Sequence, residues 1–559
     1  MNARRAAAPH ARFSGSTTIE AVRASLAGAG LALDCGYGPR PLVYADFGAS
    51  GRPSALIDER VGAISALYAN PHNEDSATGQ AATRALHAAC ARIKAALGAG
   101  PDHALIACGS GATGAIAKLQ EVLGLSLPPA TRAFLRRRMG PDFEARLESR
   151  RPVVFLGPYE HHSNELGWRE SLAEIVPVGL NEDGGIDLDA LDARLADPRY
   201  QGRQKIGAFS AASNVTGVKT DVAALARLLH RHGAILALDC AASAPYMPID
   251  LSPEDPAEAP DAISLSPHKM AGGPGACGLL VIRKTLYRHD LAPTVAGGGT
   301  VRYVTPDDHD FIADVEARER AGTPGLPQIV RAAEALELPG EIGWDEIARV
   351  EHGHLSAAIA AFETDPCVEI LGPADPDRRI ALFSFLVRPG GGDPLHPRLV
   401  ARLLNDLYGI QARAGCSCAG PYGHHLLKLD RETTRAHRAA VLDGYAGLRP
   451  GWVRVSFHWT MSAAERDYVI AAIGQIARYG ARFAADYRFD PKTGAWTNGR
   501  EPLAGDHAPD LAACLAAAEA LAGERSERPV EITLPAEHES LLRYAGLRAG
   551  GRVAEPAGA

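Results

Sequence analysis

A lysine lies between a short apolar run and a glycine-rich turn, and its surroundings suggest covalent chemistry. The apolar run over 262–265 leads into Ser266-Pro267-His268-Lys269, and the turn follows over 270–275. A lysine at the end of a buried strand is costly unless it has a function. One such function is an imine bond to a carbonyl cofactor, with Ser266 and His268 binding a phosphate. The alternative is a surface lysine beside an ordinary turn.

An aspartate ends a second apolar run, Leu236-Ala237-Leu238-Asp239. A buried carboxylate needs a cationic partner, and the protonated nitrogen of a pyridine ring would serve. The same pairing makes such a ring an electron sink. The alternative is that Asp239 caps a helix that begins at Cys240.

Three further segments have residues suited to binding a planar, phosphorylated cofactor. Gly109-Ser110-Gly111-Ala112-Thr113-Gly114 precedes a helical stretch, where N–H groups and hydroxyls bind phosphate. His161, after Glu160, can stack on a ring and transfer protons near neutral pH. Asn214, before a Val-Thr-Gly turn, can donate a hydrogen bond to a phenolic oxygen. Taken singly, each segment is more typical of an ordinary turn, but their order along the chain favours one cofactor site.

A loop of small residues, Arg413-Ala414-Gly415-Cys416-Ser417-Cys418, carries two thiols. His424 and His425 follow, but four ligands at a recognised metal-site spacing are absent, so we expect no metal. A nearby cation favours the thiolate form of a cysteine. A reactive thiol near Arg413 is therefore the better interpretation.

The apolar runs before these residues alternate with helical stretches from about residue 40 to residue 330. Such alternation is typical of an α/β fold in which helices cover both faces of a mostly parallel sheet. Functional loops then lie beyond the strand ends, at one edge of the sheet. The expected strands include 104–107, 153–156, 206–209, 235–238 and 279–282, and the expected helices include 81–97 and 222–232.

The segment Gly322-Thr323-Pro324-Gly325 interrupts this alternation, and a second unit follows it. In that unit we expect strands at 380–387 and 453–457 and a last helix at 463–482, then a helix near 508–521 and a short strand at 530–534. The predicted regions are a partly disordered N-terminal segment over 1–40, a cofactor-binding large domain over 41–330, a small C-terminal domain with the cysteine loop over 331–484, and an appendage over 485–559 whose tail is disordered from about 547.

The composition excludes several functional classes. Of 559 residues, 46% are hydrophobic and 22% are charged, as in ordinary soluble proteins. The net charge of -8 argues against a nucleic-acid surface, and no apolar run approaches the length of a membrane span. The acid-free start over 1–19 is compatible with a transit peptide, but a flexible tail is the favoured interpretation. The nine cysteines are scattered and favour a reducing cytoplasm.

Together these segments resemble the class V aminotransferase family of pyridoxal-phosphate enzymes, and within it the cysteine desulfurase and selenocysteine lyase branch. The resemblance extends from about Val43 to Arg482. It implies the fold type I architecture, with a mostly parallel seven-stranded sheet flanked by helices in the large domain and a smaller α+β C-terminal domain. The matching segments are Glu160-His161-His162, Ser213-Asn214-Val215-Thr216-Gly217, Asp239, Ser266-Pro267-His268-Lys269, Arg320-Ala321-Gly322-Thr323-Pro324 and Arg413-Ala414-Gly415-Cys416-Ser417-Cys418.

The resemblance implies a role for each cofactor-binding residue. Lys269 would form the imine with pyridoxal 5'-phosphate and move the Cα proton of the substrate, while Asp239 would pair with the pyridine nitrogen. His161 would stack on the ring as a catalytic residue, and Asn214 would lie near the phenolic oxygen. The implied phosphate-binding residues are Ala112, Thr113, Ser266 and His268.

The resemblance also implies contacts beyond the cofactor ring. Thr300 and Thr323 lie in segments that, in the family, reach the cofactor from the partner subunit, so a homodimer with shared sites is expected. Arg454 resembles the arginine that binds the substrate carboxylate, and Arg413 would assist it. A planar guanidinium suits a bidentate contact with a carboxylate.

Cys418, rather than Cys416, falls at the position of the persulfide-forming cysteine. The implied reaction converts L-cysteine to L-alanine, and the Cys418 thiolate takes the substrate sulfur. A protein that accepts this sulfur is then an expected partner. The alternatives are a class V aminotransferase, lyase or epimerase that acts on another amino acid without a persulfide step, and a non-catalytic sulfur-transfer scaffold.

Three features depart from the family pattern. Ala242 stands where desulfurases usually have a glutamine that contacts the phenolic oxygen, which weakens the desulfurase interpretation. The stretch between Cys418 and Arg454 is longer than expected, and an added loop there would reshape the mouth of the pocket. The segments at 128–150 and after 485 also look like additions.

Overall fold

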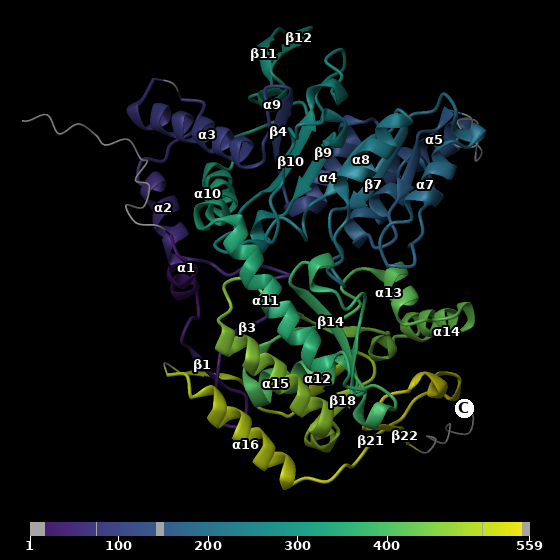
Figure 1. The fold of residues 1–559 in the computed structure, drawn as a ribbon. Helices are drawn as coiled ribbons and strands as arrows, with labels where there is room; N and C mark the ends of the chain where they lie inside the picture. Colours follow the sequence, from purple (N-terminus) through teal and green to yellow (C-terminus); the bar gives the residue numbers. More distant parts are fainter. Residues whose placement is uncertain (1–16, 74, 141–149, 506, 551–559) are drawn as a thin grey trace, which may run out of the picture. The chain divides into compact units, whose positions relative to one another are not determined.

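A computed structural model describes residues 17–73, 75–140, 150–505 and 507–550 (Figure 1). The chain forms two compact units. The first comprises Met1–Ala27, Ala49–Ser213 and Lys219–Ala348, and the second comprises Gly28–Gly48, Asn214–Val218 and Arg349–Ala559. The boundary expected near residue 330 falls within α10 (Leu326–Ile342), whereas the units divide within α11 (Trp344–Phe362).

The first unit is built on a seven-stranded sheet in the order β4-β10-β9-β8-β7-β5-β6. β10 runs opposite to the other six strands, which all share one direction, so the predicted α/β class with a mostly parallel sheet is confirmed. The apolar runs form strands because burial on both faces suits them. The strands are β4 (His103–Cys108), β5 (Val153–Leu156), β6 (Glu174–Pro177), β7 (Lys205–Ser210), β8 (Ile235–Asp239), β9 (Ala262–Leu265) and β10 (Gly278–Arg283).

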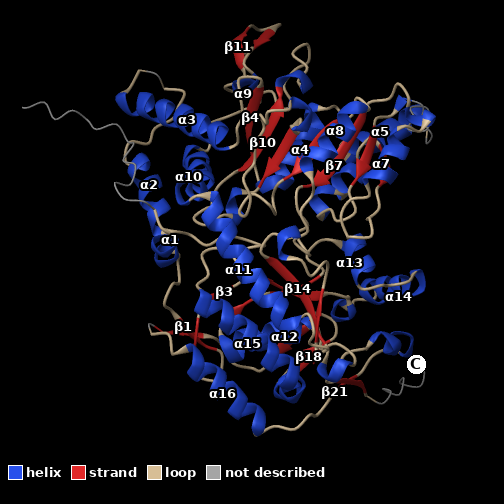
Figure 2. Cartoon of the chain, in the orientation of Figure 1, coloured by secondary structure: helices blue, strands red, loops and turns tan. Residues whose placement is uncertain are grey.

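Helices cover both faces of this sheet (Figure 2). On one face, α4 (Gly111–Val122) packs against β9 and β10, and its Ile116 and Leu119 share a buried cluster with Leu280 and Ile282 of β10. On the other face lies α8 (Val222–Arg231), which approaches so closely that a Cβ on Gly207 would lie 2.6 Å from Leu229 Cδ1. Successive residues of a strand point to opposite faces, so both faces of the sheet are buried.

The other elements of the first unit surround this core. Glu334 of α10 accepts hydrogen bonds from Arg60 of α2 and Arg92 of α3, each at 2.7 Å, and so joins three helices. The elements are α1 (Ile19–Ser25), α2 (Ala55–Ser65), α3 (Ala77–Ala96), α5 (Pro129–Met139), α6 (Leu166–Arg169), α7 (Leu188–Leu195), α9 (Val315–Arg318) and the hairpin of β11 (Val301–Val304) and β12 (His309–Phe311).

The second unit contains an antiparallel four-stranded sheet in the order β13-β14-β17-β16. The strands expected at 380–387 and 453–457 are present. The stretch between Cys418 and Arg454, expected to be a long loop, instead contains the helices α13 and α14. The elements are β13 (Val368–Ile370), β14 (Leu382–Val387), β16 (Arg413–Gly415), β17 (Trp452–Ser456), α12 (Pro397–Tyr408), α13 (Gly420–Leu426), α14 (Arg431–Leu442) and α15 (Ala463–Tyr479).

The residues after 484 belong to this second unit. β20 pairs with β1 near the start of the chain, and Arg482, just after α15, donates to the carbonyl of Ala522 in α16. β22 forms where a disordered tail was expected from about residue 547, and 551–559 lie outside the described residues. The elements are β1 (Ala32–Asp34), β2 (Pro39–Pro41), β3 (Val43–Tyr44), β15 (Ile410–Gln411), β18 (Arg488–Asp490), β19 (Ala495–Thr497), β20 (Leu503–Gly505), α16 (Leu511–Gly523), β21 (Val530–Ile532) and β22 (Leu547–Ala549).

Within the described ranges, no helix combines the length and apolar character needed to cross a membrane.

Candidate active site

The carboxyl ends of the parallel strands in the first unit bring several predicted site residues to one edge of the sheet. Asp239 ends β8, and Lys269 follows β9, the next strand of the sheet. His161 follows β5. Ligands of open α/β sheets bind beyond this edge.

Asp239 is a buried carboxyl group, only 5% exposed. Burial raises its pKa, while the Ala241 N–H, which donates to Oδ1 at 2.9 Å, and the charge of Lys269 lower it. A carboxylate in this position favours a cationic group as its partner. The partial burial of His268 itself, together with the charge of Lys269, lowers the pKa of that ring.

The start of α4 presents N–H groups and hydroxyls of the kind that bind a phosphate, and we call this group of residues the phosphate cradle. Ser110 precedes the helix without capping it through its side chain, and Ser266 Oγ accepts a hydrogen bond from the Ala112 N–H at 2.8 Å. Gly111 has φ +55°, and a Cβ on it would lie 2.7 Å from both Ser266 Oγ and His268 Cε1. Glycine therefore permits both the turn and the close approach of these groups.

His161 and Thr113 are connected through Ser163. The Thr113 and Ser163 hydroxyls are 2.7 Å apart, and the Ser163 N–H donates to His161 Nδ1 at 3.1 Å. Because Nδ1 accepts this bond, a neutral His161 carries its proton on Nε2.

The sequence assigned no role to Glu160, which is fully buried beside these residues. It accepts hydrogen bonds from the Ser210 N–H at 2.9 Å, the Ser210 hydroxyl at 2.6 Å and the Asn164 amide at 2.7 Å. Burial raises the pKa of Glu160 to about 8. Glu160 thus joins the end of β7 to the loop of His161, and its position next to that histidine was the only signal in the sequence.

Thr300 and Thr323 lie on two loops that contact each other. The Gly322 N–H donates to the Gly298 carbonyl at 2.7 Å, and the Thr300 hydroxyl donates to the Gly297 carbonyl within its own turn, also at 2.7 Å. Thr323 is exposed and accepts from the Asn70 amide at 3.4 Å. Their role toward the cofactor stays a prediction.

The second unit brings together the other predicted site residues. Arg413 of β16 and Arg454 of β17 are directly paired across two antiparallel strands, so their side chains leave the same face. Arg454 is buried, and it donates to the Asn214 carbonyl at 2.7 Å and pairs with Asp46 at 3.4 Å. A Cβ on Gly48 would lie 2.9 Å from Arg454 Cζ, so glycine makes room for the guanidinium.

Cys418 lies in a tight turn that the sequence did not reveal. The Ala419 N–H donates to the Cys416 carbonyl at 3.0 Å, and the two central residues, Ser417 and Cys418, have φ of 49° and 56°. Positive φ at both central positions defines the left-handed type of β-turn, which usually requires glycine or asparagine. The Asn214 amide, expected near the phenolic oxygen, donates to the Ser417 carbonyl at 2.7 Å and so holds this turn.

Comparison with known proteins finds relatives that match a large part of this chain. The class-V aminotransferase family model matches residues 144–469. A probable cysteine desulfurase of Streptomyces coelicolor is 30% identical over 272 residues, which are 48% of this chain and 61% of that protein. A probable cysteine desulfurase of Halalkalibacterium halodurans is 29% identical over 388 residues, which are 68% of this chain and 85% of that protein. The chain thus spans less than two thirds of the first relative.

Solved structures share the fold at lower identity. The cysteine desulfurase CsdA of Escherichia coli matches with a TM-score of 0.62 and 21% identity, over 82% of this chain and 98% of that one. An apo cysteine desulfurase of Thermococcus onnurineus matches with a TM-score of 0.61 and 22% identity, over 78% and 94%.

An α/β fold with a lysine and an aspartate at one edge of its sheet is typical of enzymes of the pyridoxal-phosphate class. The family-model match over 144–469 identifies one family within this class of enzymes. The chain belongs to the class-V aminotransferase family, whose members depend on pyridoxal phosphate.

Gly111→Ala tests the phosphate cradle. We expect the affinity for pyridoxal phosphate to fall at least about tenfold, because the new Cβ would collide with Ser266 and His268. Titration of the apoprotein, followed by cofactor absorbance, measures the affinity. Gly124→Ala is the matched control, since Gly124 also has a positive φ but open space around it. If both variants bound pyridoxal phosphate with equal affinity, the start of α4 would not be the phosphate-binding site.

Glu160→Gln tests the buried carboxyl group. The pKa of Glu160 in the folded protein, about 8, lies above its usual value of 4.5, so between these values the folded chain binds more protons than the unfolded chain. The free energy of unfolding then decreases as the pH rises through this window. The variant should lose this decrease, which is at most about 1.4 kcal/mol per pH unit. Urea unfolding at several pH values measures both slopes, and equal slopes would disprove the shift.

Proposed function

We propose that this protein is a pyridoxal-phosphate-dependent cysteine desulfurase that converts L-cysteine to L-alanine and keeps the sulfur on Cys418. The observation that carries the proposal is the left-handed turn that holds Cys418, anchored by Asn214 in the unit that also contains Arg454. Strained backbone of this kind, about 1–3 kcal/mol per residue, is typical of functional sites. The printed names of the relatives support the same activity.

The residues of the first unit fit the cofactor. The N–H groups at the start of α4, Ser266 and His268 would hold its phosphate, and Asp239 would face its ring nitrogen. When bound, pyridoxal phosphate supplies an electron sink next to the Cα of an amino acid. Asp239 would support this, because its buried carboxyl group would stabilise a positive charge on the ring nitrogen.

Side chains of this protein would bind the substrate, remove its Cα proton and accept its sulfur. Arg454 and Arg413 would bind the substrate carboxylate, and the Lys269 amine would take the proton from Cα. The Cys418 thiolate would attack the substrate sulfur, so that an S–S bond forms as the C–S bond breaks. The electron pair of the C–S bond stays with the carbon fragment, which takes up protons and leaves as alanine.

Ala242 favours a second candidate function. It is buried close after Asp239, at the position where a glutamine was expected from the family. A methyl group cannot donate a hydrogen bond to the phenolic oxygen, which changes the electronics of the bound cofactor. The second candidate is therefore another class V reaction on an amino acid, such as a lyase or epimerase reaction without a persulfide.

We also propose that the enzyme acts as a homodimer in the cytoplasm and passes its sulfur to an acceptor. The exposed hairpin β11–β12 of the first unit supports the dimer, since Tyr303 and Val304 leave large apolar side chains in solvent. The nine unpaired cysteines support a reducing compartment.

Cys418→Ala separates the two candidate functions. Cysteine-dependent formation of sulfide and alanine, measured under a reducing thiol, should fall at least about a hundredfold because the nucleophile is lost. The cofactor absorbance near 420 nm, expected for a cofactor bound to Lys269, should remain. Cys367→Ala is the control, since Cys367 is another partly buried thiol of the second unit. Undiminished turnover in Cys418→Ala would favour the reaction without a persulfide.

A double variant of the hairpin tests the dimer. Light scattering of the wild type should give twice the chain mass of 58.9 kDa. Tyr303→Asp with Val304→Asp should shift the protein toward the monomer at micromolar concentration, because charges oppose burial of this surface. Leu442→Asp, at an exposed apolar residue of α14, should leave the mass unchanged. A monomeric wild type would refute the dimer.

A further inference from the structure

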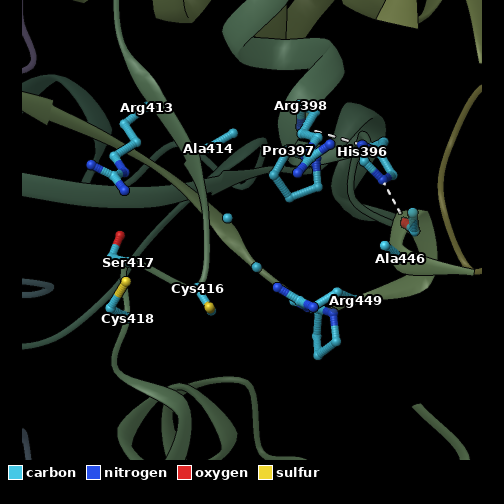
Figure 3. A pocket seen from close by; sticks show the side chains of 14 residues that line it. His396, Pro397, Arg398, Arg413, Ala414, Cys416, Ser417, Cys418, Ala446 and Arg449 are labelled. Atoms are coloured by element: carbon cyan, nitrogen blue, oxygen red, sulfur yellow. Dashed lines mark hydrogen bonds between the residues drawn. The ribbon is translucent and has the colours of Figure 1, made fainter. Parts of the chain in front are cut away.

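A pocket of about 190 Å³ lies beside the cysteine turn within the second unit (Figure 3). Its walls come from the start of α12, from β16 with the turn, and from the loop over 446–451. Cys416 and Cys418 both line it, and both are partly exposed. The volume suits a small molecule rather than a peptide segment.

The pocket is positively charged. Arg398, Arg413 and Arg449 line it, and none of its fourteen lining residues is acidic. Among the described residues, Arg413 and Arg449 form no ion pair. His396 adds no charge, because burial lowers its pKa to about 4. Three guanidinium groups without a counter-charge favour an anionic occupant.

The C-terminal hairpin of β18 and β19 holds one wall in place. The Trp496 Nε1–H donates to His396 Nδ1 at 3.2 Å, and His396 Nε2 donates to the Gly447 carbonyl at 3.0 Å. The Gly447 N–H donates to the Pro491 carbonyl at 2.9 Å, and Arg398 Nη1 donates to the Thr493 carbonyl at 2.6 Å. These bonds pre-form the wall, which lowers the entropy lost on binding.

We propose that this pocket binds a small thiol that carries a carboxylate, and that the bound thiol takes the sulfur from Cys418. The proposal rests on the proposed desulfurase function, because it needs the Cys418 persulfide. The guanidinium groups bind the carboxylate and favour the thiolate form of the occupant. The C-terminal hairpin thereby contributes to the acceptor site.

The transfer is balanced without an oxidant or a reductant. The thiolate of the small molecule attacks the outer sulfur of the Cys418 persulfide. A new S–S bond forms as the bond to Cys418 breaks, and Cys418 leaves as a thiolate that can take up a proton. The small molecule departs as its perthiol.

Three thiols of similar size and different charge test the proposal: 3-sulfanylpropanoate, 2-sulfanylethanol and 2-sulfanylethylamine. The holoenzyme is loaded with L-cysteine, separated from excess substrate, and mixed with each thiol. Alanine released during loading reports the desulfurase step by itself. Mass spectrometry of the alkylated protein then follows the loss of sulfur from Cys418.

We expect the loss to saturate with 3-sulfanylpropanoate, at a concentration at least about tenfold below that for 2-sulfanylethylamine. Arg449→Gln should raise that concentration about tenfold for the anionic thiol and leave the neutral thiol unaffected. Arg435→Gln, at an exposed arginine of α14, should behave as the wild type. If sulfur is lost from Cys418 at the same rate with all three thiols, or at an unchanged rate in Arg449→Gln, the pocket does not bind an anionic acceptor thiol. This conclusion would hold even when alanine is formed.

A labelling measurement decides the case in which loading forms no alanine. The reaction of Cys416 and Cys418 with a carboxylated aromatic disulfide, relative to neutral dipyridyl disulfide, should fall about tenfold in Arg449→Gln. An unchanged ratio would refute the anionic pocket whatever reaction the enzyme catalyses.

Discussion

The burial of the Asp239 carboxyl group sets a requirement that the surrounding structure has to meet. A carboxyl group removed from water stays protonated unless a positive charge lies near it. Two features act against this effect of burial. The Ala241 N–H donates to the carboxyl group, and the parallel strands β8 and β9 end at the same edge and bring Lys269 near it, and both lower its pKa. Polar residues of α4 and of the loop after β5 lie around the same edge, where we propose that the cofactor binds.

The second unit contains strained backbone at its candidate site, at Ser417 and Cys418, whereas the first unit contains a buried carboxyl group, that of Asp239. Its key segment is short: residues 214–218 belong to this unit although the chain on either side belongs to the first. The side-chain amide of Asn214 donates to the turn, and the backbone carbonyl of Asn214 accepts a hydrogen bond from Arg454. The next carbonyl, that of Val215, accepts from the Ser384 hydroxyl at 2.6 Å. One loop therefore fixes both the guanidinium and the turn that bears the thiol.

Much of the fold was predictable because burial leaves a strong pattern in the sequence. The runs at 153–156 and 235–238 became strands of the predicted sheet, and the grouping of Lys269 and Asp239 followed from strand order. Single-residue backbone states leave no such pattern. Nothing near Ser417 indicated a positive φ, since the turn is stabilised by Asn214, a residue distant in sequence.

The role of Glu160 and the attachment of the residues after 484 could not be predicted from the sequence either, because both depend on hydrogen bonds between residues distant in the chain. Glu160 gained its importance from Ser210 and Asn164, which reach it only in the folded chain. The residues after 484 seemed separable because they carry no catalytic motif, yet their hydrogen bonds to His396 and Gly447 make them part of the second unit. Tertiary hydrogen bonds decide such cases, and they are not visible in local composition.

The pairing of β1 with β20 has a consequence for how the protein is made. Ala32–Asp34 pairs with Leu503–Gly505, so the two strands are separated by nearly the whole chain. Their three-stranded sheet cannot be completed before Leu503–Gly505 has been synthesised. The seven-stranded sheet of the first unit is complete once β10 has been synthesised. On the ribosome, the first unit can therefore form early, while the edge of β1 that pairs with β20 stays open until synthesis is almost finished. This strand is short, which limits its tendency to pair with other chains during that wait.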